Sequence, residues 1–347
     1  MADRSGPQLL AGVLVGAALF AAVVLPVPYV ILSPGPVFDT LGSVGDTPVI
    51  SVTGAPTYPT TGRLDLTTVS ESGGPRSRVS LVDALRAGLD PDAAVVPTEL
   101  LYPAGTTADQ VDQEGAAEMA SSQDAAEIAA LRQLGLPVTD TVVVSRVDPD
   151  GPSATVLERG DRIRTVDGVA VDTPAEVKAQ VDRRSPGDAV VVGYERDDRA
   201  GVARITAAAA DDDPAQARIG VVLGVSYDSP VEVDITLEDV GGPSAGLMFS
   251  LGIVDRLTAV QETGGAHVAG TGTIDAEGLV GAIGGVQQKL AGARDAGATV
   301  FLVPAGNCAD ARASGVDGVR LVRVTSLDTA LDALATLRAG RTDVPAC

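Results

Sequence analysis

An almost uninterrupted apolar run, residues 247–257, directly follows the glycine-rich hexapeptide GGPSAG. A helix that is apolar on all sides lies inside a core. The sequence therefore predicts a buried helix around which other elements pack, with Ser244 close to its N-terminal end. Unpaired backbone N–H groups and the helix dipole favour negative charge at such an end. Ser244 is either an ordinary residue of the turn that caps this helix or a nucleophile, and the rest of the chain has to distinguish the two.

Composition limits the range of functions. The chain has 347 residues, 45% of them hydrophobic, which suggests two or three domains with cores of their own. The formal net charge of −21 argues against a nucleic-acid partner, because phosphate binding needs clustered Lys and Arg. The sequence has a single histidine and no cysteines at ligand spacing, so we predict no metal. It also lacks the G-x-x-x-x-G-K-[ST] motif, so we predict no ATP and no other cofactor.

The N-terminal segment has the features of a membrane anchor. Residues 8–25 carry no charge, and the segment is close to the ~20 residues that a helix needs to span a bilayer. A cleaved signal peptide is the alternative, but it would have a shorter apolar region followed by small residues at a cleavage site. The sequence PVPYVILSPGP follows instead. We therefore expect a transmembrane helix over residues 8–26 and a single-pass protein of the cell membrane with its catalytic domain outside the cytoplasm.

The two cysteines, Cys308 and Cys347, are compatible with two interpretations. Free cysteines are common inside cells. An anchored protein with an extracytoplasmic domain lies in an oxidising environment, where a disulfide is favoured. Such a bond would restrain the C-terminal segment and contribute roughly 4 kcal/mol in the chain-entropy model. We favour the disulfide.

Residues 27–125 are rich in Pro, Gly, Thr and Val, and VISVTGAP and GRLDLTTVS predict strands within them. Residues 105–134 are rich in Ala and acidic residues and predict a helix, with a restart at Ser121-Ser122. Residues 207–218, AAAADDDPAQAR, are typical of a linker.

Residues 126–206 have a characteristic order of elements. TVVVSRV predicts a strand, and Asp167-Gly168 predicts the turn of a hairpin. Thr173-Pro174-Ala175-Glu176 has the pattern of a capped helix start. This order, with GDRIRTVDG at its centre, resembles a PDZ domain. The resemblance implies a groove along residues 174–183 in which an extended peptide adds as a strand. A PDZ fold used only as a spacer is the alternative.

Gly242, Ser244 and Gly246 satisfy G-x-S-x-G, the nucleophile elbow of hydrolases that use a Ser-His-Asp triad. That mechanism needs a histidine well downstream. The only histidine, His267, follows the serine closely and lies in GGAHVAGTGTI, where a strand or turn position is the ordinary interpretation. The sequence therefore disfavours the triad.

Lysine is the remaining candidate for a base, and the chain has only two lysines. If Gly284-Gly285 open a helix, Lys289 falls on the same face as Val286, Leu290 and Ala293. Burial in such an apolar stripe can lower the pKa of a lysine by up to ~3–5 units. A lysine whose amine extends to the rim is the ordinary alternative.

Three motifs, GGPSAG, VAGTGTI and LVGAIGGVQQK, occur in this order. Together they resemble the proteolytic domain of Lon-type serine peptidases, which use a Ser-Lys dyad, over about residues 218–325. The resemblance implies that Ser244 is the nucleophile, that Lys289 is the general base, and that the Thr271 hydroxyl positions the lysine.

The residues around the serine have supporting roles in this interpretation. Gly242 allows a tight approach to the helix, and Ala245 and Gly246 leave room for a substrate backbone. The acidic residue that the family usually has shortly before GPSAG is missing, because Gly241 stands there. Glu238 and Asp239 are the acids nearby.

The whole arrangement resembles the membrane-anchored, YlbL-type Lon-like peptidases of bacteria. We predict an α+β multidomain protein with a transmembrane anchor (8–26), a β-rich N-terminal region with a helical connector (27–125), a PDZ domain (126–210) and a Lon-type α/β proteolytic domain (211–347). The resemblance implies ATP-independent cleavage of protein or peptide substrates, recruitment or gating by the PDZ domain, and a homo-oligomer. A non-catalytic PDZ adaptor with a Lon-like scaffold is the alternative.

Overall fold

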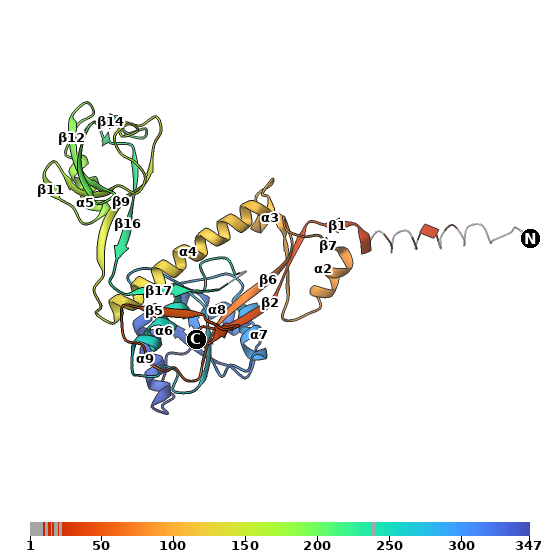
Figure 1. Cartoon of the computed structure of the whole chain (residues 1–347). Helices are drawn as coiled ribbons and strands as arrows, with labels where there is room; N and C mark the ends of the chain where they lie inside the picture. The colour runs from red at the N-terminus through yellow and green to blue at the C-terminus, as the bar shows by residue number, and fades with distance from the viewer. Residues whose placement is uncertain (1–9, 11–12, 15, 17–19, 21–22, 238–239) are drawn as a thin grey trace, which may run out of the picture. The chain divides into compact units, whose positions relative to one another are not determined.

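The computed structural model describes residues 10, 13–14, 16, 20, 23–237 and 240–347 (Figure 1). Within them the chain forms two compact units. The first combines the chain up to Leu136 with Val231–Cys347, and the second is Pro137–Pro230. The second unit is therefore an insertion in the sequence of the first.

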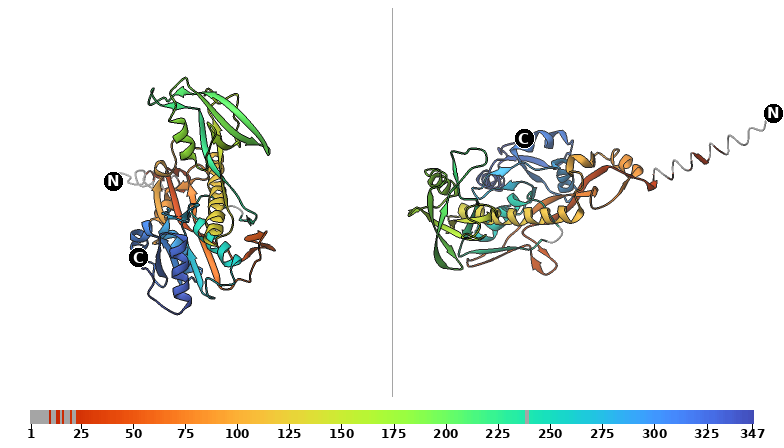
Figure 2. Two further views of the ribbon diagram at one scale, coloured as in Figure 1. Left: turned by 90° about the vertical axis from the view of Figure 1, so that its left-hand side faces the viewer. Right: turned by 90° about the horizontal axis from the view of Figure 1, so that it is seen from above.

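A six-stranded sheet organises the first unit, with the strand order β22-β21-β18-β6-β2-β8. Three of its strands come from before the insertion: β2 (Tyr29–Asp39), β6 (Arg63–Gly73) and β8 (Ala94–Pro97). The other three come from after it: β18 (His267–Gly270), β21 (Val300–Pro304) and β22 (Arg320–Val324). The two groups meet where β6 pairs with β18 in parallel. Within the first group β2 and β6 are antiparallel neighbours, which run side by side in Figure 2.

Helices cover both faces of this sheet. On one face lie α4 (Ala108–Gln133), α6 (Gly246–Leu257) and α9 (Leu327–Arg338), which share a core with Leu302 and Val322. On the other face lie α7 (Val286–Asp295) and α8 (Cys308–Ala313), which share a core with Phe301 and Val303. Successive residues of β21 thus enter opposite cores, as the alternation of side chains along a strand requires. The helix α6 is the buried apolar helix that the sequence predicted, since Leu247, Phe249 and Leu251 are fully buried.

Smaller elements complete the first unit. The short helices are α2 (Leu81–Ala87), α3 (Thr98–Leu101) and the 3-10 turn η1 (Ala305–Asn307). The short strand pairs are β1 (Pro26–Val27) with β7 (Val79–Ser80), β3 (Ser43–Val44) with β4 (Thr47–Pro48), β5 (Ile50–Thr53) with β17 (Glu232–Ile235), and β19 (Thr273–Ile274) with β20 (Val280–Gly281).

The predicted division of the chain differs from this arrangement. The N-terminal region 27–125 was expected to be separate from the proteolytic domain, yet β2, β6 and β8 belong to the same sheet as β18, β21 and β22. The predicted restart at Ser121-Ser122 is wrong, because α4 is continuous over its 26 residues. Ser122 is buried within it and its hydroxyl donates a hydrogen bond to the carbonyl of Pro243, so the serine has a tertiary partner instead of breaking the helix.

The second unit contains a six-stranded antiparallel sheet, a separate two-stranded pair and a helix. Its strands are β9 (Thr139–Val147), β10 (Arg162–Val166), β11 (Val169–Ala170), β12 (Ala189–Arg196), β13 (Arg199–Thr206), β14 (Ala208–Ala209), β15 (Ala217–Arg218) and β16 (Val221–Asp228), and its helix is α5 (Pro174–Val181). The predicted hairpin turn is confirmed, with positive φ angles of 53° at Asp167 and 81° at Gly168. The predicted helix start is also confirmed, since Thr173 and Glu176 form a capping box.

The segment predicted as a linker, residues 207–218, contains the paired strands β14 and β15. The next strand, β16, pairs with β9 along its whole length. It therefore belongs to the second unit, although the predicted boundary at residue 211 places it in the proteolytic domain.

The prediction of a transmembrane helix requires correction. Much of the segment 8–26 lies outside the described residues. Among the described residues, no helix has both the length and the apolar character needed to cross a membrane. An N-terminal spanning helix and a single-pass membrane location are therefore not supported.

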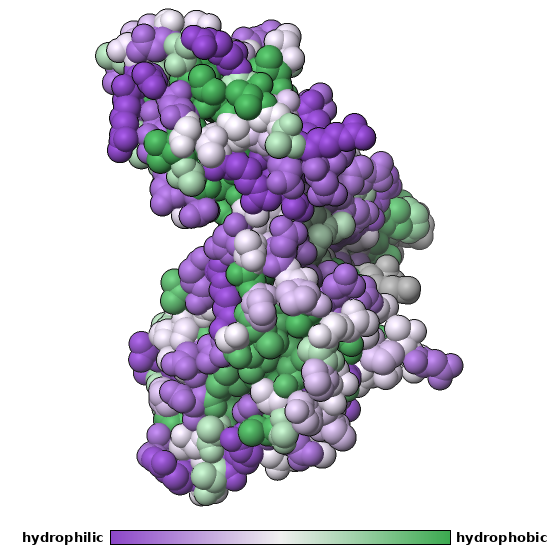
Figure 3. Space-filling view, turned by 60° about the vertical axis from the view of Figure 1, so that its left-hand side comes forward, coloured by the Kyte–Doolittle hydropathy of each residue, from purple (hydrophilic) through white to green (hydrophobic). Residues whose placement is uncertain are grey.

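In the view of Figure 3 both units are covered mainly by hydrophilic residues, and hydrophobic residues gather in the middle of the visible face of the first unit.

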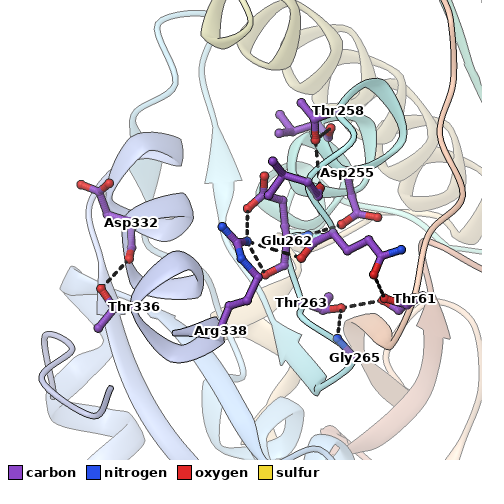
Figure 4. Close-up of polar contacts among 12 residues, drawn as sticks. Thr61, Asp255, Thr258, Glu262, Thr263, Gly265, Asp332, Thr336 and Arg338 are labelled. Carbon is purple, nitrogen blue, oxygen red and sulfur yellow. Dashed lines mark hydrogen bonds and ion pairs between the residues drawn. The ribbon is translucent and has the colours of Figure 1, made fainter. Parts of the chain in front are cut away.

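A buried carboxylate lies at the C-terminal end of α6 (Figure 4). Asp255 is 1% exposed, and its Oδ1 accepts a hydrogen bond of 2.6 Å from the backbone N–H of Glu262. Its other oxygen, Oδ2, has no hydrogen-bond partner within the described part of the chain. Arg338 forms its ion pair with Glu262 instead, at 3.0 Å. Burial, with a smaller contribution from the Glu262 carboxylate, raises the pKa of Asp255 to about 6.

This pKa predicts that Asp255 lowers stability at neutral pH. An aspartate ionises more easily in the unfolded chain, so the free energy of unfolding falls as pH rises from about 4 to 6 and then stays low. We expect Asp255→Asn to raise the free energy of unfolding by about 2 kcal/mol at pH 7.5 and to remove most of this dependence on pH. Urea unfolding at pH 4.5 and 7.5 measures both effects. A variant that is less stable at pH 7.5 but keeps the pH dependence would contradict this assignment.

Candidate active site

Ser244 lies in a tight turn immediately before α6. Gly242, with φ of +90°, adopts a conformation that L side chains rarely take, and its N–H donates to the carbonyl of Gly115 at 3.0 Å. The hydroxyl of Ser122 donates to the carbonyl of Pro243 at 2.9 Å. Helix α4 therefore holds the turn at two points, in the residues that directly precede the serine.

Ala245 is the N-cap of α6, and Gly246 is its first residue. A Cβ at Gly246 would lie 2.9 Å from Cγ2 of Ile274 and 2.9 Å from the hydroxyl oxygen of Ser122, so only glycine fits there. The glycine of the motif therefore has a packing role, because it lets the start of α6 approach α4 and β19 closely.

Thr271 follows the last residue of β18 and connects that strand to the serine. Its hydroxyl donates to the backbone carbonyl of Ser244 at 3.0 Å. The N–H of Gly272 donates to the same carbonyl at 2.9 Å. The main chain at Ser244 is thus fixed from the sheet as well as from α4.

Lys289 lies in the second turn of α7. The residue before this helix, Gly285, has a left-handed conformation with φ of +67°. The side chain is 4% exposed, so it is buried in the apolar stripe and the alternative of an amine at the rim is wrong. Its Nζ lies 2.7 Å from Oγ of Ser244 and 3.1 Å from Oγ1 of Thr271 and donates to both. The structure thus brings Ser244, Thr271 and Lys289 together from three separate elements.

The environment of Lys289 changes its acidity. Burial lowers the pKa of the amine to about 8, because the charged form loses its hydration. A lysine with this pKa is partly neutral near neutral pH, and a neutral amine within hydrogen-bonding distance of a hydroxyl accepts its proton. The arrangement fulfils the geometric requirement for an activated serine nucleophile.

Ser244 and Lys289 open into a cavity of about 400 Å³. Its wall is formed by β6 through Thr67–Val69, by α4 through Met119, and by the segment Ala282–Gly285. Most of these residues are apolar or uncharged. Glu71 also lies in the wall, and its carboxylate accepts a hydrogen bond from the Tyr102 hydroxyl.

Other predicted residues lie elsewhere. Glu238 and Asp239 are outside the described residues. His267 is at the beginning of β18, and its Nε2 lies 2.6 Å from Oδ2 of the fully buried Asp65, which Arg63 also contacts. Cys308 and Cys347 form a disulfide with a Cα–Cα distance of 5.1 Å.

Sequence reasoning missed the contributions of the N-terminal half to this site. Ser122, Thr67 and Met119 lie more than a hundred residues before Ser244, and the segments that contain them carry no catalytic motif. The only signal in the sequence was the pair Ser121-Ser122, which is unusual in an Ala-rich helix and which we interpreted as an interruption.

The second unit has its own groove, a cavity of about 730 Å³ beside α5. Val177 and Val181 of the helix line it, together with Ile219, which lies just before β16, and Leu223, which lies within β16. The predicted groove along residues 174–183 therefore corresponds to a real hollow with an apolar lining.

Comparison with known proteins defines the class of this chain. Residues 119–206 match the family description "PDZ domain", and residues 237–334 match "Lon protease (S16) C-terminal proteolytic domain". The chain therefore combines a PDZ domain with a Lon-type proteolytic domain. The predicted resemblance to PDZ-containing Lon-like peptidases and the predicted class of enzyme, a Lon-type serine peptidase, are confirmed.

Individual relatives give the extent of this similarity. Lon protease of Clostridioides difficile (strain 630) is 43% identical over 63 residues, which is 18% of this chain and 8% of that protein. Lon protease of Xanthomonas oryzae pv. oryzae is 38% identical over 94 residues, 26% of this chain and 11% of that protein. Lon protease of Phenylobacterium zucineum is 34% identical over 98 residues, 27% of this chain and 12% of that protein. The chain thus spans only about a tenth of the length of these curated relatives.

Some solved structures match about a quarter of the chain. The PDZ domain of an SdrC-like protein from Listeria monocytogenes is 31% identical, with 24% of this chain and 85% of that chain covered and a TM-score of 0.22. A solution structure from Geobacillus thermodenitrificans is 33% identical, with 24% and 94% covered and a TM-score of 0.22.

Proposed function

We propose that this chain is an endopeptidase that cleaves unfolded proteins or peptides without ATP, using Ser244 as nucleophile and Lys289 as general base. The observation that carries the proposal is the distance of 2.7 Å between Nζ of the buried Lys289 and Oγ of Ser244. The absence of a G-x-x-x-x-G-K-[ST] motif from the sequence supports independence from ATP.

The steps of the reaction follow from this geometry. The neutral amine of Lys289 takes the proton of Ser244 as Oγ attacks the carbonyl carbon of the scissile bond. The resulting oxyanion lies near the beginning of α6, where backbone N–H groups and the helix dipole stabilise negative charge. Lys289 then gives its proton to the leaving amine, and an acyl-enzyme on Ser244 remains. Water hydrolyses this ester with Lys289 as the base again and releases the second product.

The role of Thr271 is to keep the amine of Lys289 and the main chain of Ser244 at fixed positions relative to each other. Its hydroxyl contacts both the Nζ of Lys289 and the carbonyl of Ser244, at 3.1 and 3.0 Å. Neither group can move without breaking a hydrogen bond to this residue.

We further propose that the PDZ unit recruits substrates or gates access to the site, and that the chain forms a homo-oligomer as Lon-type domains do.

The test is cleavage of an unfolded protein by the full chain, with and without ATP. We expect fragments without ATP, no stimulation by ATP, and no cleavage by Ser244→Ala. Ser121→Ala, which changes an exposed serine of α4, is the matched control and should cleave normally. If Ser244→Ala cleaves as fast as the wild type, another site is responsible. If the wild type does not cleave at all, the non-catalytic adaptor becomes the better interpretation.

A further inference from the structure

The chain contains a single asparagine, Asn307, and the chemistry described above does not use it. It is the last residue of η1 and directly precedes α8, and only 5% of it is exposed. A buried amide side chain needs hydrogen-bond partners, because leaving its donors and acceptor unpaired costs free energy. The partners of Asn307 therefore indicate what it does.

Both ends of the Asn307 amide bind the backbone of one residue, Ile283. The Nδ2 group donates to the carbonyl of Ile283 at 2.9 Å, and the N–H of Ile283 donates to Oδ1 at 2.9 Å. The side chain thus pairs with the main chain as a neighbouring strand would. Ile283 lies in the segment Ala282–Gly285, which joins β20 to α7 and has no regular structure of its own.

This segment leads directly to the general base. Ile283 and Gly285 line the cavity that contains Ser244 and Lys289. Gly285 is the N-cap of α7, and its carbonyl accepts a hydrogen bond of 3.0 Å from the N–H of Lys289. On its other side Gly285 packs against β6, since a Cβ there would lie 2.6 Å from Cγ2 of Val69. The beginning of α7 is therefore held between β6 and the amide of Asn307.

Asn307 is itself firmly held. It follows β21, whose residues Val300–Pro304 are all buried. It precedes Cys308, which is bonded to Cys347. The C-terminal segment in turn lies against β22, because the N–H of Arg323 donates to the carbonyl of Pro345 at 2.8 Å. The amide thus projects from a turn that is anchored between β21 and the disulfide onto an irregular segment of the active site.

We propose that Asn307 is a positioning residue of the dyad, whose amide fixes residues 282–285 and through them the first turn of α7 and the Nζ of Lys289. This inference rests on the proposed function, because it explains what keeps the general base in place. A displacement of about 1 Å at a reacting group can cost about a hundredfold in rate. The two hydrogen bonds to Ile283 are therefore worth testing separately from the dyad itself.

The experiment uses the full chain as the variants Asn307→Ala and Asn307→Asp. The aspartate has the same shape and keeps an acceptor for the Ile283 N–H, but it loses the Nδ2 donor. Ser80→Ala is the control, because it removes the N-cap of α2 in the same unit without touching the cavity. The first readout is NMR titration of the lysine Cε signals. The chain has two lysines, and Lys178→Arg in the same background assigns them.

We expect the Lys289 signal to titrate higher in Asn307→Ala than in the wild type, by at least about half a pH unit, because a loosened α7 lets water reach Nζ. The kcat for a peptide substrate should fall about 10- to 100-fold with little change in KM. Ser80→Ala should leave both values unchanged.

The assignment would be overturned if a folded Asn307→Ala had an acid dissociation constant of Lys289 and a kcat that are both within twofold of the wild-type values. If Asn307→Ala does not fold, Asn307→Asp is judged by the same two measurements. Because the titration needs no catalysis, an inactive wild type would contradict the proposed function alone and leave this inference to be decided by the NMR signal.

Discussion

Replacing Lys289 by alanine is expected to lower kcat for peptide cleavage by about 10⁴-fold, as loss of a catalytic base does in serine hydrolases. The reason is that Nζ of Lys289 is the basic group in contact with Oγ of Ser244 in the described part of the chain. Lys289→Arg should be equally inactive, because a guanidinium keeps the positive charge but does not lose its proton at these pH values. Initial rates with a short peptide, together with circular dichroism to show that each variant folds, measure this.

A matched control addresses the alternative base. His267 contacts Asp65 at 2.6 Å, so its ring is already paired with a buried carboxylate. His267→Gln keeps a hydrogen-bonding group at that position, and we expect its kcat to stay within about threefold of the wild type. Loss of activity in His267→Gln with full activity in Lys289→Ala would reverse the assignment and restore the Ser-His hypothesis.

The second large effect is the dependence of cleavage on pH. Burial lowers the pKa of Lys289 to about 8, and only the neutral amine accepts the proton of Ser244. Below pH 8 the neutral fraction falls tenfold for each pH unit, so kcat/KM at pH 6 should be about a hundredfold below its plateau, which is reached near pH 9. A peptide without ionisable side chains isolates this effect from changes in the substrate.

The sign of the accompanying stability change is opposite to that for Asp255. A lysine whose pKa is lowered by folding binds its proton more weakly in the folded chain than in the unfolded one. The free energy of unfolding therefore rises with pH between about 8 and the ordinary lysine pKa. For the cleavage reaction, a kcat/KM that stays constant from pH 6 to 9 would rule out a lysine base with this pKa.

Local pattern predicted the parts of the site that lie after the insertion. The run 247–257 indicated the core helix, and the spacing along α7 placed Lys289 in its apolar stripe but left open whether the amine is buried or extends to the rim. Ser122 and Thr67 could not be predicted in this way. Their roles depend on the packing of α4 against the turn before α6 and on the pairing of β6 with β18, and such long-range contacts have no counterpart in local periodicity.

The limits of the second unit show the same difficulty. Residues 207–218 are small and acidic, which is typical of a linker, but they form a short hairpin with β14 and β15. The strand β16 has an ordinary β composition and could pair in either unit. Only its register with β9, from Val221↔Val147 to Asp228↔Thr139, assigns it to the second unit.

The insertion has a practical consequence for dissecting this protein. A fragment that begins at residue 211 contains Ser244, Thr271 and Lys289 but lacks β6, the neighbour of β18, and lacks the α4 residues that hold the turn before the nucleophile. No single truncation can separate the two units, because the first one is discontinuous in sequence. An internal deletion that joins Leu136 to Val231 keeps the whole six-stranded sheet. Conversely, a cut within the second unit yields two pieces with three strands of that sheet each, so this chain is suited to assays in which separately expressed halves restore peptidase activity on mixing.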